Sequence, residues 1–157
     1  MTDKLRFVRV GETRNEALAG MEADYLGRIS RFYPASFVTV TPEKNRSRGD
    51  GEIRELETRK LLEAAEGSGT LVAVDERGST WTSVKFSKWL GSEVDRNPHG
   101  VVFITGGDLG YTEEIRNVAG LVLSLSTMTL PHEMARVVLL EQVYRACTIL
   151  RGVRYHK

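Results

Sequence analysis

Cysteine and proline are scarce in this sequence, with one cysteine and four prolines among 157 residues. The cysteine, Cys147, sits within an apolar run and can form no disulfide inside the chain. The three histidines are not spaced as metal ligands are, so we expect no metal site. A lone cysteine without metal-ligand spacing favours a reducing, cytoplasmic setting.

An excess of charge of one sign is also lacking. Lysine and arginine number 22 against 21 aspartates and glutamates, a formal net charge of +1. This balance excludes a basic field over the whole surface, so any nucleic-acid site must be a local patch. No apolar run approaches the ~18 residues that cross a bilayer. The charged segment 1–14 has no apolar signal core, so we expect neither a membrane protein nor a secreted one.

Short apolar runs and amphipathic segments alternate along the chain. Apolar residues at three- and four-residue steps predict helices, and short apolar runs are typical of strands covered on both faces. The polar, basic segment 43–51 is expected to be a loop. This alternation predicts one α/β domain, residues 1–157, with a mostly parallel sheet and helices on both faces. The expected strands are 5–10, 37–40, 70–74, 101–105 and 121–125, and the expected helices are 13–30, 53–65 (ended by Gly67 or Gly69), 82–94, 112–119 and 132–150.

Three loops follow the three most apolar of these strands, at 75–78, 106–110 and 126–132. Ligands of parallel α/β sheets bind at the carboxyl ends of the strands, so a pocket built from these loops is the first-choice active site. The segment 126–132 is rich in serine and threonine and leads into a long helix. It is either a capped loop, with Thr129 as N-cap and Pro131 in the first turn, or a wrap around an adenine.

The glycine-rich loop 106–110 reads Gly-Gly-Asp-Leu-Gly. It forms either a plain tight turn or a place where a ligand approaches the backbone closely. The motif is not the dinucleotide fingerprint, and Asp108 would repel a pyrophosphate. A flavodoxin-like nucleotide protein is therefore disfavoured. A cofactor without phosphates, carrying an adenosine and a cationic sulfonium, fits the loop better.

The last predicted helix is apolar around most of its circumference, so it must be buried nearly all round. We expect one face to pack on the sheet and another on a second subunit. The alternative is a helix enclosed within one subunit. Its apolar residues are Met134, Val137, Val138, Leu139, Leu140, Val143, Tyr144, Ala146, Cys147, Ile149 and Leu150.

The C-terminal tail is basic and aromatic. From Gln142 to Lys157 the chain carries two arginines before Gly152 and Arg154 and Lys157 after it, without any acid. Such a tail is either a solvated end or an RNA contact in which Tyr155 stacks on a splayed-out base and cations hold phosphates.

Two long motifs make the chain recognisable. They are TLPHEMARVVLLEQVYRA at 129–146 and RGVRYHK at 151–157, accompanied by FITGGDLG at 103–110 and the first strand ending Val10-Gly11. Together they resemble the ribosomal RNA large subunit methyltransferase H family of the SPOUT superfamily. The resemblance covers the whole chain, although residues 42–69 share only the general residue pattern of the family and no specific motif.

The resemblance implies a fold that pattern alone would not justify, a trefoil α/β knot with a threaded C-terminal segment. It also implies an obligate homodimer and S-adenosylmethionine bound in the knot. The cofactor contacts that it implies fall in the three loops already selected: Val74, Gly106, Leu125, Ser126, Thr127, Met128, Thr129 and Leu130.

The activity implied by the resemblance is methylation of a pseudouridine at N3, in 23S rRNA of the assembled ribosome. A protonated imide nitrogen is a poor nucleophile, so a group must accept or stabilise its proton. Our hypothesis is that the tail of one subunit completes the site of the other. The alternatives are a SPOUT methyltransferase acting on tRNA and a non-catalytic ribosome-binding protein. The candidate catalytic residues are His132, Arg136, Arg154, Tyr155 and His156.

Overall fold

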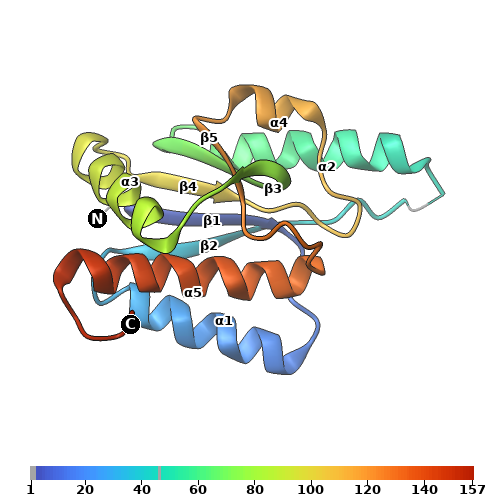
Figure 1. The fold of residues 1–157 in the computed structure, drawn as a ribbon. Helices are drawn as coiled ribbons and strands as arrows, with labels where there is room; N and C mark the ends of the chain where they lie inside the picture. The colour runs from blue at the N-terminus through green and yellow to red at the C-terminus, as the bar shows by residue number, and fades with distance from the viewer. Residues whose placement is uncertain (1–2, 46) are drawn as a thin grey trace.

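A computed structural model describes residues 3–45 and 47–157. Its centre is a five-stranded sheet in which every pair of neighbouring strands is parallel, in the order β2-β1-β4-β3-β5 (Figure 1). The prediction of an α/β fold with a parallel sheet is confirmed. The strands are β1 (Leu5–Val10), β2 (Ala35–Val40), β3 (Thr70–Thr80), β4 (Val101–Ile104) and β5 (Leu121–Ser124).

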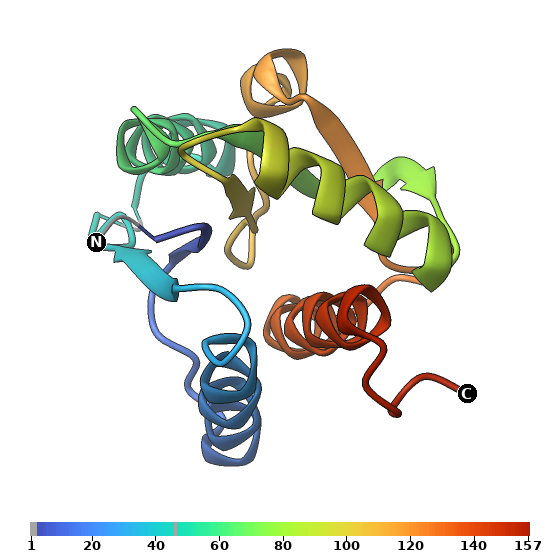
Figure 2. The ribbon, with the colours of Figure 1, turned by 90° about the vertical axis from the view of Figure 1, so that its left-hand side faces the viewer.

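Helices cover both faces of the sheet, as predicted. On one face lie α1 (Glu16–Ile29), α3 (Ser83–Arg96) and α5 (His132–Arg151). On the other lie α2 (Asp50–Ala65) and the short α4 (Glu113–Val118). Figure 2 shows this layering from the end of the sheet. No helix in the two described ranges is long and apolar enough to cross a membrane.

The side chains of β1 alternate between two hydrophobic clusters, one on each face of the sheet. Phe7 packs in the cluster under α1, α3 and α5, and Val8 packs in the cluster under α2 and α4. Arg9 shares the face of Phe7 and is only 6% exposed. Because a buried charge needs a partner, its guanidinium forms an ion pair with the equally buried Glu22, with an Nη1–Oε1 distance of 2.5 Å.

The strand β3 is longer than the segment 70–74 that we predicted. The chain leaves the β5 register after Val74 and rejoins it at Ser79, and both residues face Leu123. Residues 75–78 therefore bulge out of a strand that continues, instead of ending it. At Gly78 a Cβ would lie 2.5 Å from the Val122 carbonyl oxygen, so only glycine lets the strands close again.

Two helix starts and one helix cap differ from the prediction, each for a local reason. Helix α2 begins at Asp50, inside the expected loop 43–51, because acids in its first turn complement the helix dipole. Helix α1 begins at Glu16, where the Asn15 side chain accepts a hydrogen bond from the Leu18 amide. Thr129 does not cap α5, because Pro131 occupies the N-cap position and no side chain caps the helix.

Helix α5 lies between α1, α3 and the sheet, and none of its residues from 135 to 150 is exposed. Cys147 is fully buried, and this burial raises the pKa of its thiol to about 12. Its own chain encloses most of α5, so this helix does not need a second subunit to be covered, and the expectation that one face packs on a second subunit stays a prediction. Burial of α5 is therefore no argument for a dimer.

Candidate cofactor pocket

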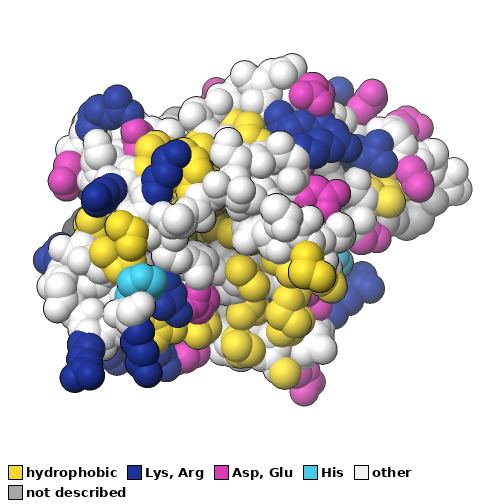
Figure 3. Space-filling view, in the orientation of Figure 1, with side chains coloured by type: hydrophobic (Ala, Val, Ile, Leu, Met, Phe, Trp, Pro, Cys, Tyr) yellow, Lys and Arg dark blue, Asp and Glu magenta, His cyan; other side chains and the backbone are white. Residues whose placement is uncertain are grey.

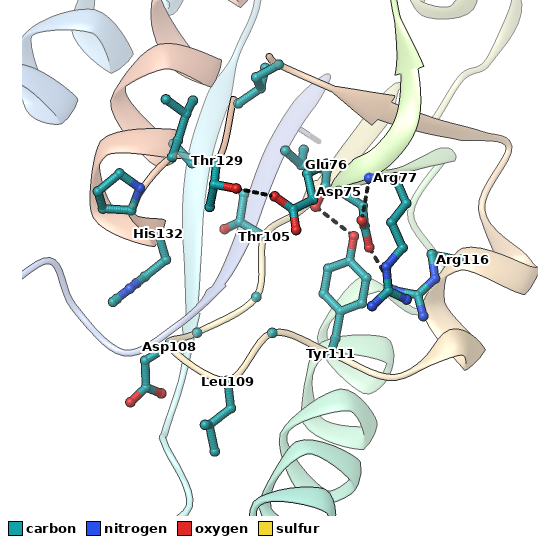
Figure 4. Close-up of a pocket in the computed structure, with 18 of the residues that line it drawn as sticks. Asp75, Glu76, Arg77, Thr105, Asp108, Leu109, Tyr111, Arg116, Thr129 and His132 are labelled. Carbon is teal, nitrogen blue, oxygen red and sulfur yellow. Dashed lines mark hydrogen bonds and ion pairs between the residues drawn. The ribbon is translucent and has the colours of Figure 1, made fainter. Parts of the chain in front are cut away.

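A cavity of about 840 Å³ opens at the carboxyl ends of the strands. Its wall comprises the β3 bulge, the glycine-rich loop 106–110 and the segment 125–132 (Figure 4). The prediction that these three loops form one pocket is confirmed. A cavity of this size encloses ligands as large as a nucleoside cofactor.

The glycine-rich loop folds tightly on itself at one side of the pocket. The Gly110 amide donates to the Gly107 carbonyl oxygen at 3.1 Å, and Gly110 has a φ of +71°. At Gly106 a Cβ would lie 2.8 Å from the Gly110 Cα atom. Two side chains of α2 hold the loop from outside. Arg54 Nε donates to the Leu109 carbonyl oxygen at 2.9 Å, and Thr58 Oγ1 accepts from the Thr112 amide at 2.9 Å.

A tyrosine joins the glycine-rich loop to the β3 bulge. The Tyr111 hydroxyl donates to the Val74 carbonyl oxygen at 2.7 Å (Figure 4). Burial, and then the negative charge of Asp75, raises the pKa of Tyr111, so the phenol remains a hydrogen-bond donor. Asp75 also forms an ion pair with Arg116 of α4 at 2.7 Å, and both side chains are nearly buried. These contacts fix two pocket walls relative to each other.

The third wall, segment 125–132, is shaped by its own hydroxyl groups. Ser126 Oγ accepts from the Met128 amide at 2.9 Å, which forms a tight turn. Thr129 Oγ1 donates to Glu76 Oε2 at 2.9 Å and so links this wall to the β3 bulge. Met128 is 76% exposed. The turn is thus held by the hydroxyl groups of its own segment.

Seven of the eight residues expected to contact the cofactor line the cavity: Val74, Gly106, Leu125, Ser126, Met128, Thr129 and Leu130. Thr127 is the exception. It is exposed within the turn that Ser126 makes, and it is not among the lining residues.

The candidate catalytic residues are separated. His132 lines the cavity, whereas Arg136, one turn further along α5, is 3% exposed and does not. The Arg136 guanidinium donates to the Val10 carbonyl oxygen at 2.6 Å and to Thr13 Oγ1 at 3.0 Å. Burial, and then the nearby charge of Arg9, lowers the pKa of Arg136. Arg136 therefore anchors the start of α5 to the end of β1 and does not face the pocket.

The three tail candidates lie toward the other end of α5. Tyr155 packs on the helix, with its ring centroid 4.8 Å from that of Tyr144, and its hydroxyl donates to Glu141 Oε1 at 3.1 Å. His156 Nδ1 lies 3.1 Å from Arg145 Nη1, and Arg154 is exposed. None of the three lines the cavity of its own chain.

Sequence reasoning missed the side chains that brace the pocket. Tyr111 directly follows the glycine-rich loop, and an aromatic residue at that position was a usable signal. Arg54, Thr58 and Arg116 lie on helices far from the loops in sequence, and no local pattern marks them.

The pocket suits an adenosyl sulfonium better than a dinucleotide. Residues of three loops line it. The carboxylates of Asp75, Glu76 and Asp108 lie in its lining, where a sulfonium is tolerated and a pyrophosphate is repelled. Within residues 3–45 and 47–157, no group of three His, Cys, Asp or Glu side chains is placed to hold a metal ion.

Comparison with known proteins agrees with this chemistry. Residues 4–156 match the model of a family described as predicted SPOUT methyltransferase. A Ribosomal RNA large subunit methyltransferase H of Trichlorobacter lovleyi is 42% identical over 98% of this chain and 99% of its own length. One of Gemmatimonas aurantiaca is 38% identical over 94% and 96%.

Solved structures share the fold at low sequence identity. A probable methylase family protein from Haemophilus influenzae Rd KW20 matches with a TM-score of 0.60 and 13% identity, covering 100% of this chain and 72% of that one. A probable methyltransferase from Bordetella pertussis Tohama I matches with a TM-score of 0.59 and 14% identity, covering 92% and 94%. SPOUT methyltransferases use S-adenosylmethionine as methyl donor. With its parallel sheet, three-loop pocket and full-length relatives, this chain belongs to the ribosomal RNA large subunit methyltransferase H family of SPOUT methyltransferases.

Proposed function

We propose that this chain transfers a methyl group from S-adenosylmethionine to N3 of a pseudouridine in 23S rRNA, within assembled ribosomes of the bacterial cytoplasm. The observation that carries the proposal is the three-loop pocket in a chain that matches the named rRNA methyltransferases from end to end. S-adenosylmethionine supplies an electrophilic methyl group when bound.

The backbones of the three loops hold the cofactor in this proposal. Val74, Gly106 and residues 125–130 surround the adenosine, including Thr127 through its main chain. Tyr111 and Arg116 keep the walls at a fixed separation, so that binding requires little rearrangement. The proposal includes the expected knot, in which a C-terminal segment threaded through the loops would bring segment 125–132 against the other two loops.

His132 is the group best placed to act on the substrate proton. It lies in the pocket lining at the first position of α5. A pseudouridine N3 must lose its proton as the methyl group arrives, and an imidazole or a water that it orients accepts that proton. The tail residues Arg154, Tyr155 and His156 reach a pocket only in a second copy of the chain, where we assign them to the target base and its phosphates.

A homodimer supplies that second copy. Two apolar side chains, Met21 of α1 and Met134 of α5, are 46% and 40% exposed. The exposed Met128 lies just before the start of α5. Figure 3 shows hydrophobic side chains gathered over α1 and the first half of α5. A patch of this kind on a soluble chain is typical of a subunit interface.

Methyl transfer from labelled S-adenosylmethionine tests the proposal directly. We expect label in assembled ribosomes, much less in separated large subunits and naked rRNA, and none in tRNA. Nucleoside mapping should place the label on N3 of a pseudouridine. Labelled tRNA would assign the chain to a different substrate. A calorimetric titration without cofactor binding would make it a non-catalytic ribosome-binding protein.

A further inference from the structure

Helix α3 presents a stripe of aromatic and basic side chains. Trp81 lies one residue before the N-cap Thr82, and Val84, Lys85, Lys88 and Trp89 follow at steps that place them on one face of the helix. The rings of Trp81 and Trp89 are 6.0 Å apart in an edge-to-face arrangement. Both tryptophans are half-buried, Val84 is 41% exposed, and both lysines are exposed.

The hydrophobic core covers only part of the surface of each tryptophan side chain. Trp89 stacks on the buried Phe86 with ring centroids 6.2 Å apart, and both indoles pack against the core cluster. Their remaining surface faces solvent. Lys85 Nζ lies 4.5 Å from the Trp81 ring centroid, so a cation already occupies part of this aromatic surface.

The charge on this stripe is of one sign. The segment from Trp81 to Ser92 contains two lysines and no acid. The next acid, Glu93, is buried and bonded to Thr70 and Arg96, so it does not neutralise the lysines. In a chain whose net charge is only +1, such a stripe is a local basic patch.

The stripe lies on the same side of the molecule as the basic tail. Helix α3 runs beside the second half of α5, where Ser83 Oγ donates to Gln142 Oε1 at 2.7 Å and Gly91 packs against Leu150. Figure 2 shows the tail leaving α5 on the side where α3 begins. In Figure 3, hydrophobic side chains flanked by lysine or arginine lie over α3, and a histidine with further cations lies over the tail below.

We propose that this α3 stripe binds a single-stranded rRNA segment next to the target nucleotide, with Trp81 and Trp89 against bases and Lys85 and Lys88 against phosphates. Indole rings beside lysines are the usual combination for sequence-tolerant binding of unpaired nucleotides. A second protein chain fits less well, because lysine is depleted in protein–protein interfaces. The inference rests on the proposed function, since it names how the substrate of that site is held.

The chain offers an internal reporter, because its only two tryptophans are those of the stripe. The full-length protein is titrated with a short single-stranded oligoribonucleotide while tryptophan fluorescence is followed. We expect saturable quenching in the wild type and in each of Trp81→Phe and Trp89→Phe, since each retains one stacked indole. Saturating RNA that leaves the fluorescence of all three proteins unchanged would overturn the proposal.

Charge reversal separates this surface from the pocket. Lys85→Glu combined with Lys88→Glu should weaken oligonucleotide binding about tenfold and reduce the slope of log K against log salt by about 1.4, for two phosphate contacts. It should raise KM for ribosomes while cofactor affinity stays unchanged. The matched control, Lys44→Glu with Arg59→Glu, reverses two exposed cations away from this surface and should bind RNA more tightly than the stripe variant.

Each remaining outcome has a definite meaning. If the lysine variant binds RNA as the wild type does, or if it dissociates the dimer, the stripe is not an RNA surface. If the wild type binds cofactor and RNA with quenching but does not methylate ribosomes, the proposed reaction fails and the RNA surface stands.

Discussion

The two ends of α5 carry different chemistry. At the N-terminal end, three loops with mixed charges form a pocket. At the C-terminal end, Tyr155, His156 and several cations fold back onto the helix. The helix has 20 residues and is therefore about 30 Å long. In our proposal, the first end binds the cofactor and the second end binds RNA.

Because of this separation, a single chain does not bring its cofactor pocket and its basic tail together. Residues that belong to one reaction in our proposal lie at opposite ends of a rigid element. A second copy, oriented so that its tail meets the first pocket, resolves the separation.

Removing the tail should abolish the reaction without affecting the pocket. A chain ending at Leu150 lacks Arg154, Tyr155 and His156, and none of these lines the cavity. We expect methyl transfer to ribosomes to fall at least about a hundredfold, because the target base is no longer positioned. Cofactor affinity by calorimetry should change less than about twofold, which is about 0.4 kcal/mol.

Mixing two defective chains tests whether the tail acts on the partner's pocket. The tail-truncated chain is unfolded and refolded together with a full-length Gly106→Val chain, whose pocket is blocked. A mixed dimer then contains one intact pocket and one intact tail on different subunits. Recovery of activity supports sharing between subunits, and a mixture as inactive as its two parents contradicts it.

Adding a methyl group to the glycine-rich loop should damage cofactor binding selectively. In Gly106→Ala the new Cβ would lie 2.8 Å from Gly110 Cα and 3.2 Å from the Tyr111 ring, so the loop must shift. We expect cofactor affinity to fall at least tenfold, about 1.4 kcal/mol. Gly20→Ala, where a Cβ meets nothing within 4 Å, is the matched control and should bind normally. Equal affinities in the two variants would mean that the loop does not contact the cofactor.

Deleting one hydroxyl should weaken the pocket moderately. Tyr111→Phe removes the bond to the Val74 carbonyl oxygen that joins two walls. The loss of one buried hydrogen bond costs about 1 kcal/mol, so cofactor affinity should fall about fivefold. Tyr33→Phe, at a half-buried tyrosine away from the cavity, serves as the control. An unaltered affinity in Tyr111→Phe would show that the wall separation does not matter for binding.

The smallest effect concerns the junction between α1 and α5. Glu133 accepts hydrogen bonds from the Arg14 and Asn15 amides at 2.7 and 3.2 Å, and the first of these is the main reason that its pKa is lowered. A carboxylate with a depressed folded-state pKa stabilises the fold above its ordinary value of 4.5, and this contribution is lost as pH falls through the lower, folded value. Urea midpoints of wild type and Glu133→Gln should differ at pH 7 and converge in acid. If the difference between the two urea midpoints does not change with pH, the stabilisation comes from the shape of the Glu133 side chain and not from its charge.

The sequence predicted the pocket better than it predicted what supports the pocket. Loops 106–110 and 125–132 follow apolar strands, and strand ends in a parallel sheet meet at one edge, so their proximity follows from local patterns. The length of β3 did not follow, because Asp75, Glu76 and Arg77 resemble a loop and only pairing with β5 restores the strand. Arg54 and Arg116 are unmarked because their partners are main-chain or acidic groups distant in sequence.

Arg136 shows how sequence proximity misleads. It stands four residues after His132 in a recognisable motif, which suggested that both face the pocket. Arg136 instead points away from the pocket and donates hydrogen bonds to the end of β1 and to Thr13, which anchors the start of α5. The apolar circumference of α5 predicts burial, but it does not specify whether the same chain or a second subunit covers each face.

The buried thiol of Cys147 gives α5 a chemical reporter. A fully enclosed thiol with a pKa near 12 exposes neither sulfur nor thiolate to a maleimide or a disulfide reagent. Modification therefore proceeds only through molecules in which α5 has lifted from α1 and α3. Since this is the only cysteine of the chain, its labelling rate measures that opening without any engineered probe.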